Sequence, residues 1–392
     1  MKRLSLALLC GAACLASASV ASAQEPLKGY SAVVPATRIA PEDSPTAQFH
    51  ALVSPAPIPR FSYTLQASAA LGGGTFTGSI VGRNPLNHGK TTTTIPTQLV
   101  PLVITINGVT YDPTLPDACV TGNPTDISII ANSPIFTNNA WTMNGQNMGT
   151  TQYIDAFQRA QFGLQGTPYH LILQESQLPA QALTFNGGTN QPRTCSNGQA
   201  GSLGRVDFTI FDNAIQALIM GPLAGTVNVG TFPIFLTRNV VLTENGGALC
   251  CILGYHGAFF VMGQLQIYSP FSIDTGPFFI PGFVSALSHE MGEAINDPPG
   301  NNPTPSWGNI GQVVGACQGN FEVGDPLSPG FGTPTNPFTV VGGNGLTYTL
   351  QELAFYSWFY GSNGLGTGAG GRFSDNGTFK GDAIICPPGG TN

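Results

Sequence analysis

The stretch PGFVSALSHEMGEAINDP, residues 281–298, constrains this chain most, because here alone an imidazole and several carboxylates lie at helical spacing. The large apolar side chains share one side of the predicted helix: Phe283, Val284, Leu287, Met291, Ala294 and Ile295. The other side carries His289, Glu293 and Asn296 among very small residues, which let a neighbouring backbone come close. The pattern predicts one amphipathic helix of about four turns.

The same helix carries the pattern HExxE, which places a candidate metal site on its small-residue side. His289 and Glu293 are one turn apart and can converge on one ion, while Glu290 lies where the glutamate of an HExxH motif acts as general base. Zinc accepts a carboxylate in place of the second histidine. The alternative is a packed helix whose histidine bonds locally. Charged residues make up only 8% of the chain, so the cluster of Glu290, Glu293 and Asp297 favours a cation.

Further ligands must come from outside the helix. No histidine follows His289, so a downstream ligand must be an oxygen, and Glu322 and Asp325 in FEVGD are the natural candidates. Asp297 is another option, or it starts the turn before the two prolines. His256 interrupts two apolar runs in GYHGAF. It is either a site residue facing His289 or a buried histidine bonded to backbone.

The first residues, MKRLSLALLCGAACLASASVASAQ, combine two basic residues, an apolar run and a small-residue cleavage pattern. They predict a signal peptide over residues 1–23, and hence a secreted or periplasmic protein. No later apolar run is long enough to predict a transmembrane segment. The net charge is −7 with only 13 Lys and Arg, which leaves no basic surface for nucleic acid.

Six cysteines follow the predicted cleavage site, enough for up to three disulfides in an oxidising compartment. Cys317 and Cys386 enclose the C-terminal segment and are a candidate pair. Cys250 and Cys251 are adjacent, and neighbours on a strand point to opposite sides. We therefore expect them to bond to other cysteines rather than to each other. The expected partners are Cys119 and Cys195.

The order of patterns along the chain predicts an α+β fold. Residues 24–60 are expected to form a Pro-rich extended arm, and residues 61–392 a single large α+β domain with the metal site in 250–392. Short alternating strands, the hairpin signal Asn107-Gly108 and 51 Gly with 32 Pro indicate a mixed, mainly antiparallel sheet with a few helices.

Local patterns also predict particular elements. Residues 117–149 are rich in Asn, Thr, Pro and Gly and are expected to be loop. A helix follows near residues 150–163, in which Asp155 and Arg159 should form a surface pair. FDNAIQALI is predicted to be a second helix, capped by Asp212.

The combination SHEMGEAINDP, a following Trp-Gly and then FEVGD resembles secreted bacterial proteins that carry an SHExxEAxxDP helix and a later ExGD. It is also distantly similar to plant phosphate-induced or Exordium-like proteins, in which a similar helix ends in Asn-Pro after a turn like GYHGAF. The plant pattern lacks the His-Glu pair. By analogy with zincins, the resemblance implies His289 and Glu293 as ligands, Glu322 as the third ligand and Glu290 as base.

These features lead to two functional expectations. The first is a zinc-dependent hydrolase acting on a peptide or protein, in which Glu290 accepts a proton and His256 or Tyr255 stabilises the oxyanion. The second is a non-catalytic cell-surface or matrix protein whose carboxylates bind Ca²⁺ or form a hydrogen-bonded network. Calcium would favour oxygen ligands such as Asp297 and Asp325, with His289 outside the coordination shell.

Overall fold

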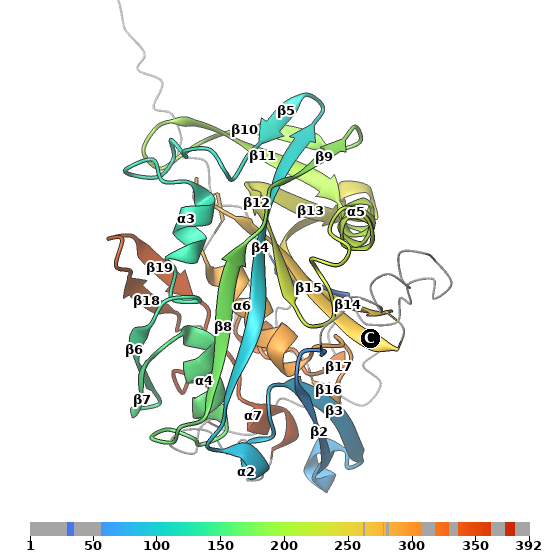
Figure 1. Ribbon diagram of the computed structural model, residues 1–392, viewed down its shortest axis with the longest axis vertical. Coiled ribbons are helices and arrows are strands. Elements are labelled where there is room, and N and C mark those ends of the chain that lie inside the picture. Colours follow the sequence, from blue (N-terminus) through green and yellow to red (C-terminus); the bar gives the residue numbers. More distant parts are fainter. Residues whose placement is uncertain are drawn as a thin grey trace, which may run out of the picture.

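The computed structural model describes residues 30–34, 56–261, 263–276, 278–279, 282–307, 318–328, 336–361 and 373–380. The predicted signal peptide, most of the Pro-rich arm and both cysteines of the candidate pair Cys317 and Cys386 lie outside these ranges. The described chain is a mixed α+β structure, which confirms the predicted fold class (Figure 1).

A large mixed sheet runs through the molecule. Its main path has the order β10-β11-β13-β14-β15-β12-β4-β5, with β1 added beside β14 and β8 and β9 beside β4. The strands are β1 (Tyr30–Val34), β4 (Thr92–Ile106), β5 (Val109–Tyr111), β8 (His170–Gln177), β9 (Gln181–Phe185), β10 (Thr189–Thr194), β11 (Ala200–Asp207), β12 (Phe232–Arg238), β13 (Val240–Glu244), β14 (Leu249–Val261) and β15 (Gln264–Ile273). Strand β14 pairs antiparallel with β13 and β15 and parallel with β1, so it lies inside the sheet.

Within the described residues, four antiparallel strand pairs and several short helices surround the sheet. These pairs join β2 (Arg60–Gln66) with β3 (Thr75–Val81), β6 (Asn139–Met143) with β7 (Gln146–Thr151), β16 (Pro303–Trp307) with β17 (Gln318–Asn320), and β18 (Phe338–Val341) with β19 (Thr347–Leu350). The α-helices are α2 (Pro85–His88), α3 (Asp126–Ala131), α4 (Tyr153–Gln161), α5 (Phe208–Met220), α6 (Ser285–Asn296) and α7 (Tyr356–Tyr360). Short 3₁₀ turns occupy Ala69–Leu71, Asn245–Gly247 and Asp325–Leu327.

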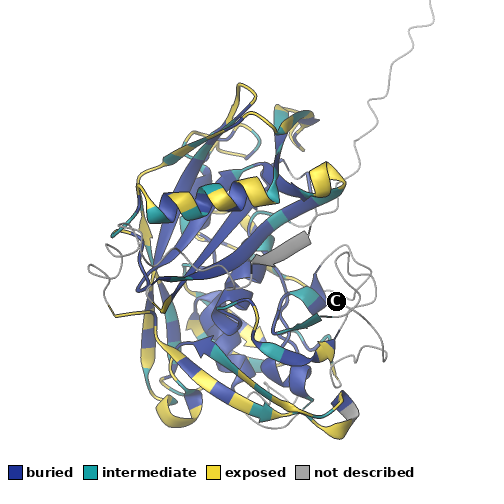
Figure 2. Ribbon diagram, turned by 90° about the vertical axis from the view of Figure 1, so that its right-hand side faces the viewer, coloured by how far each residue is buried: buried dark blue, intermediate teal, exposed yellow. Residues whose placement is uncertain are grey.

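Helices α5 and α6 cover opposite faces of the sheet, each over its own apolar cluster. Helix α5 lies at the surface, and its outer side is exposed (Figure 2). Helix α6 packs on β14 and β15 and also contacts β19, β3 and α4, so it is enclosed. The small-residue side of α6 therefore faces protein: a Cβ added to Gly292 would lie 2.6 Å from a methyl carbon of Leu353.

Several local predictions are confirmed. Asn107 and Gly108 join β4 and β5 with φ angles of 46° and 85°, the left-handed values that a two-residue hairpin turn requires. Helix α6 ends at Asn296, directly before Asp297 and the two prolines, because a residue preceding proline avoids helical geometry. The sequence therefore located both the hairpin and the end of the central helix.

Other local predictions are wrong. Residues 117–149 are not loop throughout, because they contain α3, β6 and part of β7. Asp155 and Arg159 are buried rather than paired at the surface: Asp155 lies 2.8 Å from Nδ1 of His170, while Arg159 donates to the backbone oxygen of Met148. The cap of α5 is Asp207, which accepts from two backbone N–H groups of the first turn.

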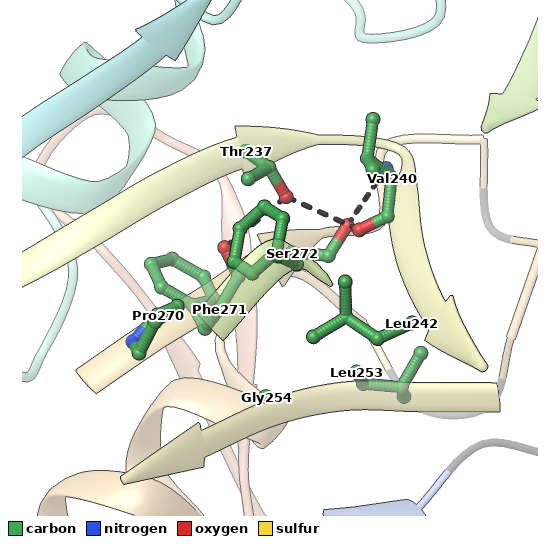
Figure 3. A pocket seen from close by; sticks show the side chains of 9 residues that line it. Thr237, Val240, Leu242, Leu253, Gly254, Pro270, Phe271 and Ser272 are labelled. Carbon is green, nitrogen blue, oxygen red and sulfur yellow. Dashed lines mark hydrogen bonds between the residues drawn. The ribbon is translucent and has the colours of Figure 1, made fainter. Parts of the chain in front are cut away.

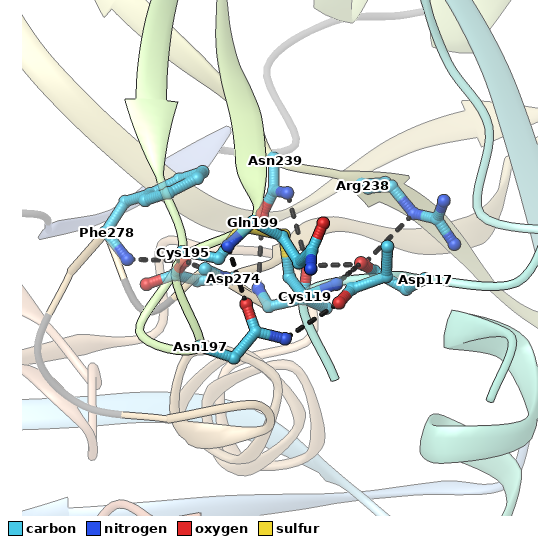
Figure 4. Close-up of a disulfide and its surroundings, with 12 residues drawn as sticks. Asp117, Cys119, Cys195, Asn197, Gln199, Arg238, Asn239, Asp274 and Phe278 are labelled. Carbon is cyan, nitrogen blue, oxygen red and sulfur yellow. Dashed lines mark hydrogen bonds and ion pairs between the residues drawn. A yellow bond between two sulfur atoms is a disulfide. The ribbon is translucent and has the colours of Figure 1, made fainter. Parts of the chain in front are cut away.

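The cysteine pairing also differs from the expected one. Cys119 bonds to Cys195, and Cys250 bonds to its neighbour Cys251. Figure 4 shows the first bridge beside Asp117 and Asn197; it joins the segment after β5 to the turn between β10 and β11. A groove of about 350 Å³ lies over this bridge, between β5, β11 and the end of β12.

The sheet itself is tightly packed. A cavity of about 10 Å³ lies between β12, β13, β14 and β15, lined by Leu242, Gly254, Phe271 and Ser272 among others (Figure 3). This volume is close to that of one water molecule, so the cavity cannot take a substrate. None of the helices in the described part of the chain combines the length and apolar character that a membrane span requires.

Candidate metal centre

Helix α6 places His289, Glu290 and Glu293 beneath the sheet. All three side chains are buried, with 0–2% of their surface exposed. The apolar side of the helix, including Leu287 and Met291, packs into the larger core and fixes its rotation. Charged groups are rarely buried without a partner of opposite charge or a metal. The two buried glutamates therefore need a proton or a cation nearby.

Glu293 lies at the middle of the cluster and uses its two oxygens differently. Its Oε1 accepts hydrogen bonds from the backbone N–H groups of Gly324 and Asp325, at 3.1 and 3.2 Å. Its Oε2 lies 3.0 Å from Nε2 of His289 and 3.7 Å from Nδ1 of His256. One oxygen therefore holds the 324–325 loop, and the other faces both imidazoles.

Gln351 determines which nitrogen of His289 carries the hydrogen. The amide nitrogen of Gln351 donates to the backbone oxygen of Gly324, so its Oε1 is left to accept from Nδ1 of His289, at 3.0 Å. In the neutral imidazole Nε2 then has a lone pair, which points toward carboxylate oxygens of Glu293 and Asp325 at 3.0 and 3.6 Å. Two electron-rich atoms in contact repel each other unless a proton or a cation lies between them.

His256 on β14 is arranged like His289: one ring nitrogen faces an acceptor, and the other is directed toward carboxylates. Its Nε2 lies 3.2 Å from the backbone oxygen of Asp297, which can only accept, so Nε2 carries the hydrogen. Its Nδ1 has no hydrogen-bond partner among the described residues and lies 3.5 Å from Oε2 of Glu290 and 3.7 Å from Oε2 of Glu293. A metal-binding histidine typically donates its other N–H to a backbone or side-chain oxygen, as both histidines do here.

The buried groups of the cluster can hold a metal ion. Two sets of three have all their ligand atoms within 4.8 Å of one another, and they share Glu293. The first set is His256, Glu290 and Glu293, and the second is His289, Glu293 and Asp325. Imidazole nitrogen and carboxylate oxygen together suit zinc and related divalent metals.

No family model, curated protein or solved structure matches this chain. What the site can do must therefore be argued from its own geometry and electrostatics.

Burial shifts the pKa values of the cluster. It raises the pKa of Glu293 well above its usual range, and the negative charges of Asp325 and Glu290 add to this effect. Burial and the neighbouring carboxylate of Glu293 raise the pKa of Glu322 in the same way. Burial also lowers the pKa of His256 to about 4, against the opposing effect of the Asp297 carboxylate. Raised carboxyl pKa values show that several acids share a site where full ionisation is costly, and a divalent cation relieves this cost by displacing their protons, while a neutral imidazole is ready to bind it.

The structure brings together most of the residues singled out in the sequence. His289, Glu293 and Asp325 form one ligand set, and His256 reaches the same carboxylates from β14 rather than from a break between strands. Glu322 is buried beside them: its Oε2 lies 4.0 Å from Nε2 of His256, outside both sets.

Two other candidates, Asp297 and Tyr255, lie outside both ligand sets, as does the nearby Trp307. Asp297 accepts from the backbone N–H groups of Asn302 and Phe321, so its carboxylate organises the turn after α6. Trp307 fills core against Trp358. Tyr255 donates to Asp212 on the α5 side of the sheet and cannot reach the centre.

Gln351 was not among the site residues predicted from the sequence. Neither were two glycines whose lack of a side chain lets the backbone lie against His289 and Glu290. A Cβ on Gly324 would lie 2.5 Å from Nδ1 of His289, and one on Gly254 would lie 3.0 Å from Cγ of Glu290. Nothing local in YTLQEL indicates that Gln351 contacts a helix more than sixty residues earlier. The available indication of these two glycines was their position next to candidate site residues, in FEVGDP and in ILGYHG.

Proposed function

We propose that this protein is an exported, zinc-dependent hydrolase that cleaves peptide bonds. The observation that carries the proposal is the convergence of lone-pair nitrogens from His256 and His289 on one oxygen of Glu293, with Glu290 alongside. Two imidazoles in contact with the carboxylates favour zinc over calcium, which prefers oxygen ligands alone.

The proposed roles follow from the contacts of each residue. His289, Glu293 and Asp325 would hold the ion, which supplies a Lewis acid that polarises a carbonyl and acidifies water. Glu290 lies in contact distance of the same cluster and would take the proton from the attacking water. The side chain of Asp325 is 21% exposed, so substrate would approach from this side.

His256 is better suited to hold an ion than to stabilise an oxyanion. Its N–H is already donated to Asp297, and its lowered pKa keeps the ring neutral near pH 7. Its second nitrogen therefore offers a lone pair and no hydrogen. We therefore propose a ligand role for this residue in place of the expected donation to an oxyanion.

Export rests on the sequence and is supported by the two disulfides among the described residues, because disulfides are typical of oxidising compartments. The resemblance of SHEMGEAINDP and FEVGD to secreted bacterial proteins with an SHExxEAxxDP helix supports the same proposal.

A second candidate function is favoured by the burial of the ligands. His256, His289, Glu290 and Glu293 are all at most 2% exposed, and a structural metal site is closed where a catalytic one keeps an open position. In this alternative the ion joins α6, β14 and the 322–325 segment and stabilises the exported protein without catalysis.

The test combines metal analysis with peptide cleavage. The purified protein is expected to contain zinc and to cleave a denatured protein substrate or a fluorogenic peptide library. Glu290→Gln should keep the fold but lose at least about a hundredfold of the activity, a typical contribution of a general base. His289→Ala should lose activity and bind less zinc, whereas His88→Ala, at an exposed histidine of α2, should change neither. Bound zinc that raises the melting temperature without hydrolysis would support the structural alternative.

A further inference from the structure

We infer that the centre binds two divalent metal ions, bridged by a single oxygen of Glu293. This inference rests on the proposed metal-dependent function and extends it from one ion to a pair. The ligand atoms fall into two sets, each complete in itself: His256 with Glu290, and His289 with Asp325, both joined by Glu293.

The two buried imidazoles identify two positions rather than one. Nδ1 of His256 and Nε2 of His289 each lack a hydrogen-bond partner within the described residues, and each belongs to a different ligand set. Each ring is fixed from its far side by an acceptor, Asp297 O in one case and Gln351 Oε1 in the other. Each lone pair is therefore held in a defined direction, as in metal sites with outer-shell support.

Glu293 has the features of a bridging ligand. Its Oε1 accepts from two backbone N–H groups, whereas its Oε2 is the oxygen within reach of both imidazoles. A carboxylate oxygen has two lone pairs and can offer one to each ion. Two-metal hydrolytic sites typically hold their ions about 3.5–4 Å apart, a spacing that one shared oxygen permits.

The charge of the cluster agrees with two ions. Glu290, Glu293, Glu322 and Asp325 are gathered with two imidazoles, and the ion pairs of Glu293 and Glu322 in the described chain are all with histidine. Metal binding displaces protons from coordinating carboxyl groups, and this group supplies enough carboxylates to neutralise two divalent cations.

In this arrangement Glu290 is a ligand of the His256 ion, besides any part in proton transfer. The two sets can then be emptied separately by single substitutions. Asp325→Asn weakens only the His289 set, and Glu290→Gln weakens only the His256 set. Glu293→Gln affects both.

The experiment uses the full protein, stripped with a chelator, dialysed against excess Zn²⁺ and then against buffer, with zinc per chain measured by mass spectrometry. We expect two zinc ions per chain in the wild type and in His88→Ala, one in Asp325→Asn, one in Glu290→Gln and none in Glu293→Gln. One ion per chain in the wild type, or two that survive both single substitutions, would overturn the inference.

A second readout separates bridged ions from independent ones. In Mn²⁺-loaded wild type, a shared oxygen couples the two spins, and the paramagnetic resonance spectrum should differ from the isolated-ion spectrum of Asp325→Asn. Identical spectra from the two proteins would overturn the inference. One bound ion with hydrolysis would reject the pair but keep the proposed function. Two coupled ions without hydrolysis would keep the pair and reject the hydrolase.

Discussion

Nδ1 of His289 lies 3.0 Å from Oε1 of Gln351, whose amide nitrogen is already donated to the backbone of Gly324. This contact turns the lone pair of the imidazole toward Glu293 and Asp325, the direction in which the candidate metal centre needs it.

Replacing Gln351 with Leu should weaken metal binding without removing any ligand. Loss of an outer-shell partner of a ligating histidine typically lowers metal affinity by roughly 10–100-fold. Competition against a chromophoric chelator measures this change. Gln98→Leu is the matched control, because Gln98 is also buried but donates to Thr226, away from the centre. Equal affinity in the two variants would contradict the role given to Gln351.

Gly324→Ala should disturb the centre through a steric contact alone. The φ of Gly324 is −86°, a value that alanine adopts freely, but the added Cβ would lie 2.5 Å from Nδ1 of His289. We expect a loss of about 1–3 kcal/mol in the free energy of unfolding, together with weaker metal binding.

Urea unfolding and chelator competition measure the two effects. The control is Gly319→Ala on β17, where the nearest atom to an added Cβ is 3.7 Å away. If both alanine variants behave alike, the close approach of the loop to His289 does not matter.

Protonation of His256 should reduce the stability of the metal-free protein in mild acid. Burial lowers its folded pKa to about 4, whereas the unfolded chain has a pKa near 6.5, so the unfolded state takes up the proton first as pH falls. Stability is therefore lost between about pH 6.5 and pH 4, by at most about 3 kcal/mol, with no further loss below.

The measurement is the difference in unfolding free energy between wild type and His256→Gln, both stripped of metal, at several pH values. The wild type should lose its relative stability as pH falls from 7 to 4, because other titrating groups are common to both proteins. A difference that stays constant over this range would show that His256 does not titrate as proposed.

Asp207→Ala should destabilise helix α5 without affecting the metal. Asp207 accepts from the backbone N–H groups of Thr209 and Ile210, and removing such a cap costs about 1 kcal/mol. Asp207→Asn keeps an acceptor and should retain most of the stability. Chemical denaturation compares the two variants, and metal content should equal that of the wild type in both. A larger loss in Asp207→Asn than in Asp207→Ala would refute the capping role.

Features of the fold that depend on neighbouring residues could be predicted from the sequence. The turn at Asn107-Gly108 and the end of α6 at Asn296 follow from left-handed geometry and from proline. The position of His289 relative to Glu293 follows from one helical turn.

Features that depend on distant partners could not be predicted. Cys119 meets Cys195 across 76 residues, and no local signal distinguishes this pair from the other pairings that six cysteines allow. Strands β6 and β7 form in a polar segment because they pair with each other and bury Trp141 and Met148. Gln351 reaches His289 only because β19 ends beside α6.

Tyr255 and His256 are consecutive on β14, and their side chains leave opposite faces of the sheet. A slip of β14 by a single position would exchange them, presenting a phenol to the acids of α6 and an imidazole to the layer under α5. The composition of the candidate metal centre thus depends on which residues of this interior strand occupy alternate positions. A one-residue insertion that shifted this register would remove the imidazole of His256 from the centre, although the residue would still be present in the sequence.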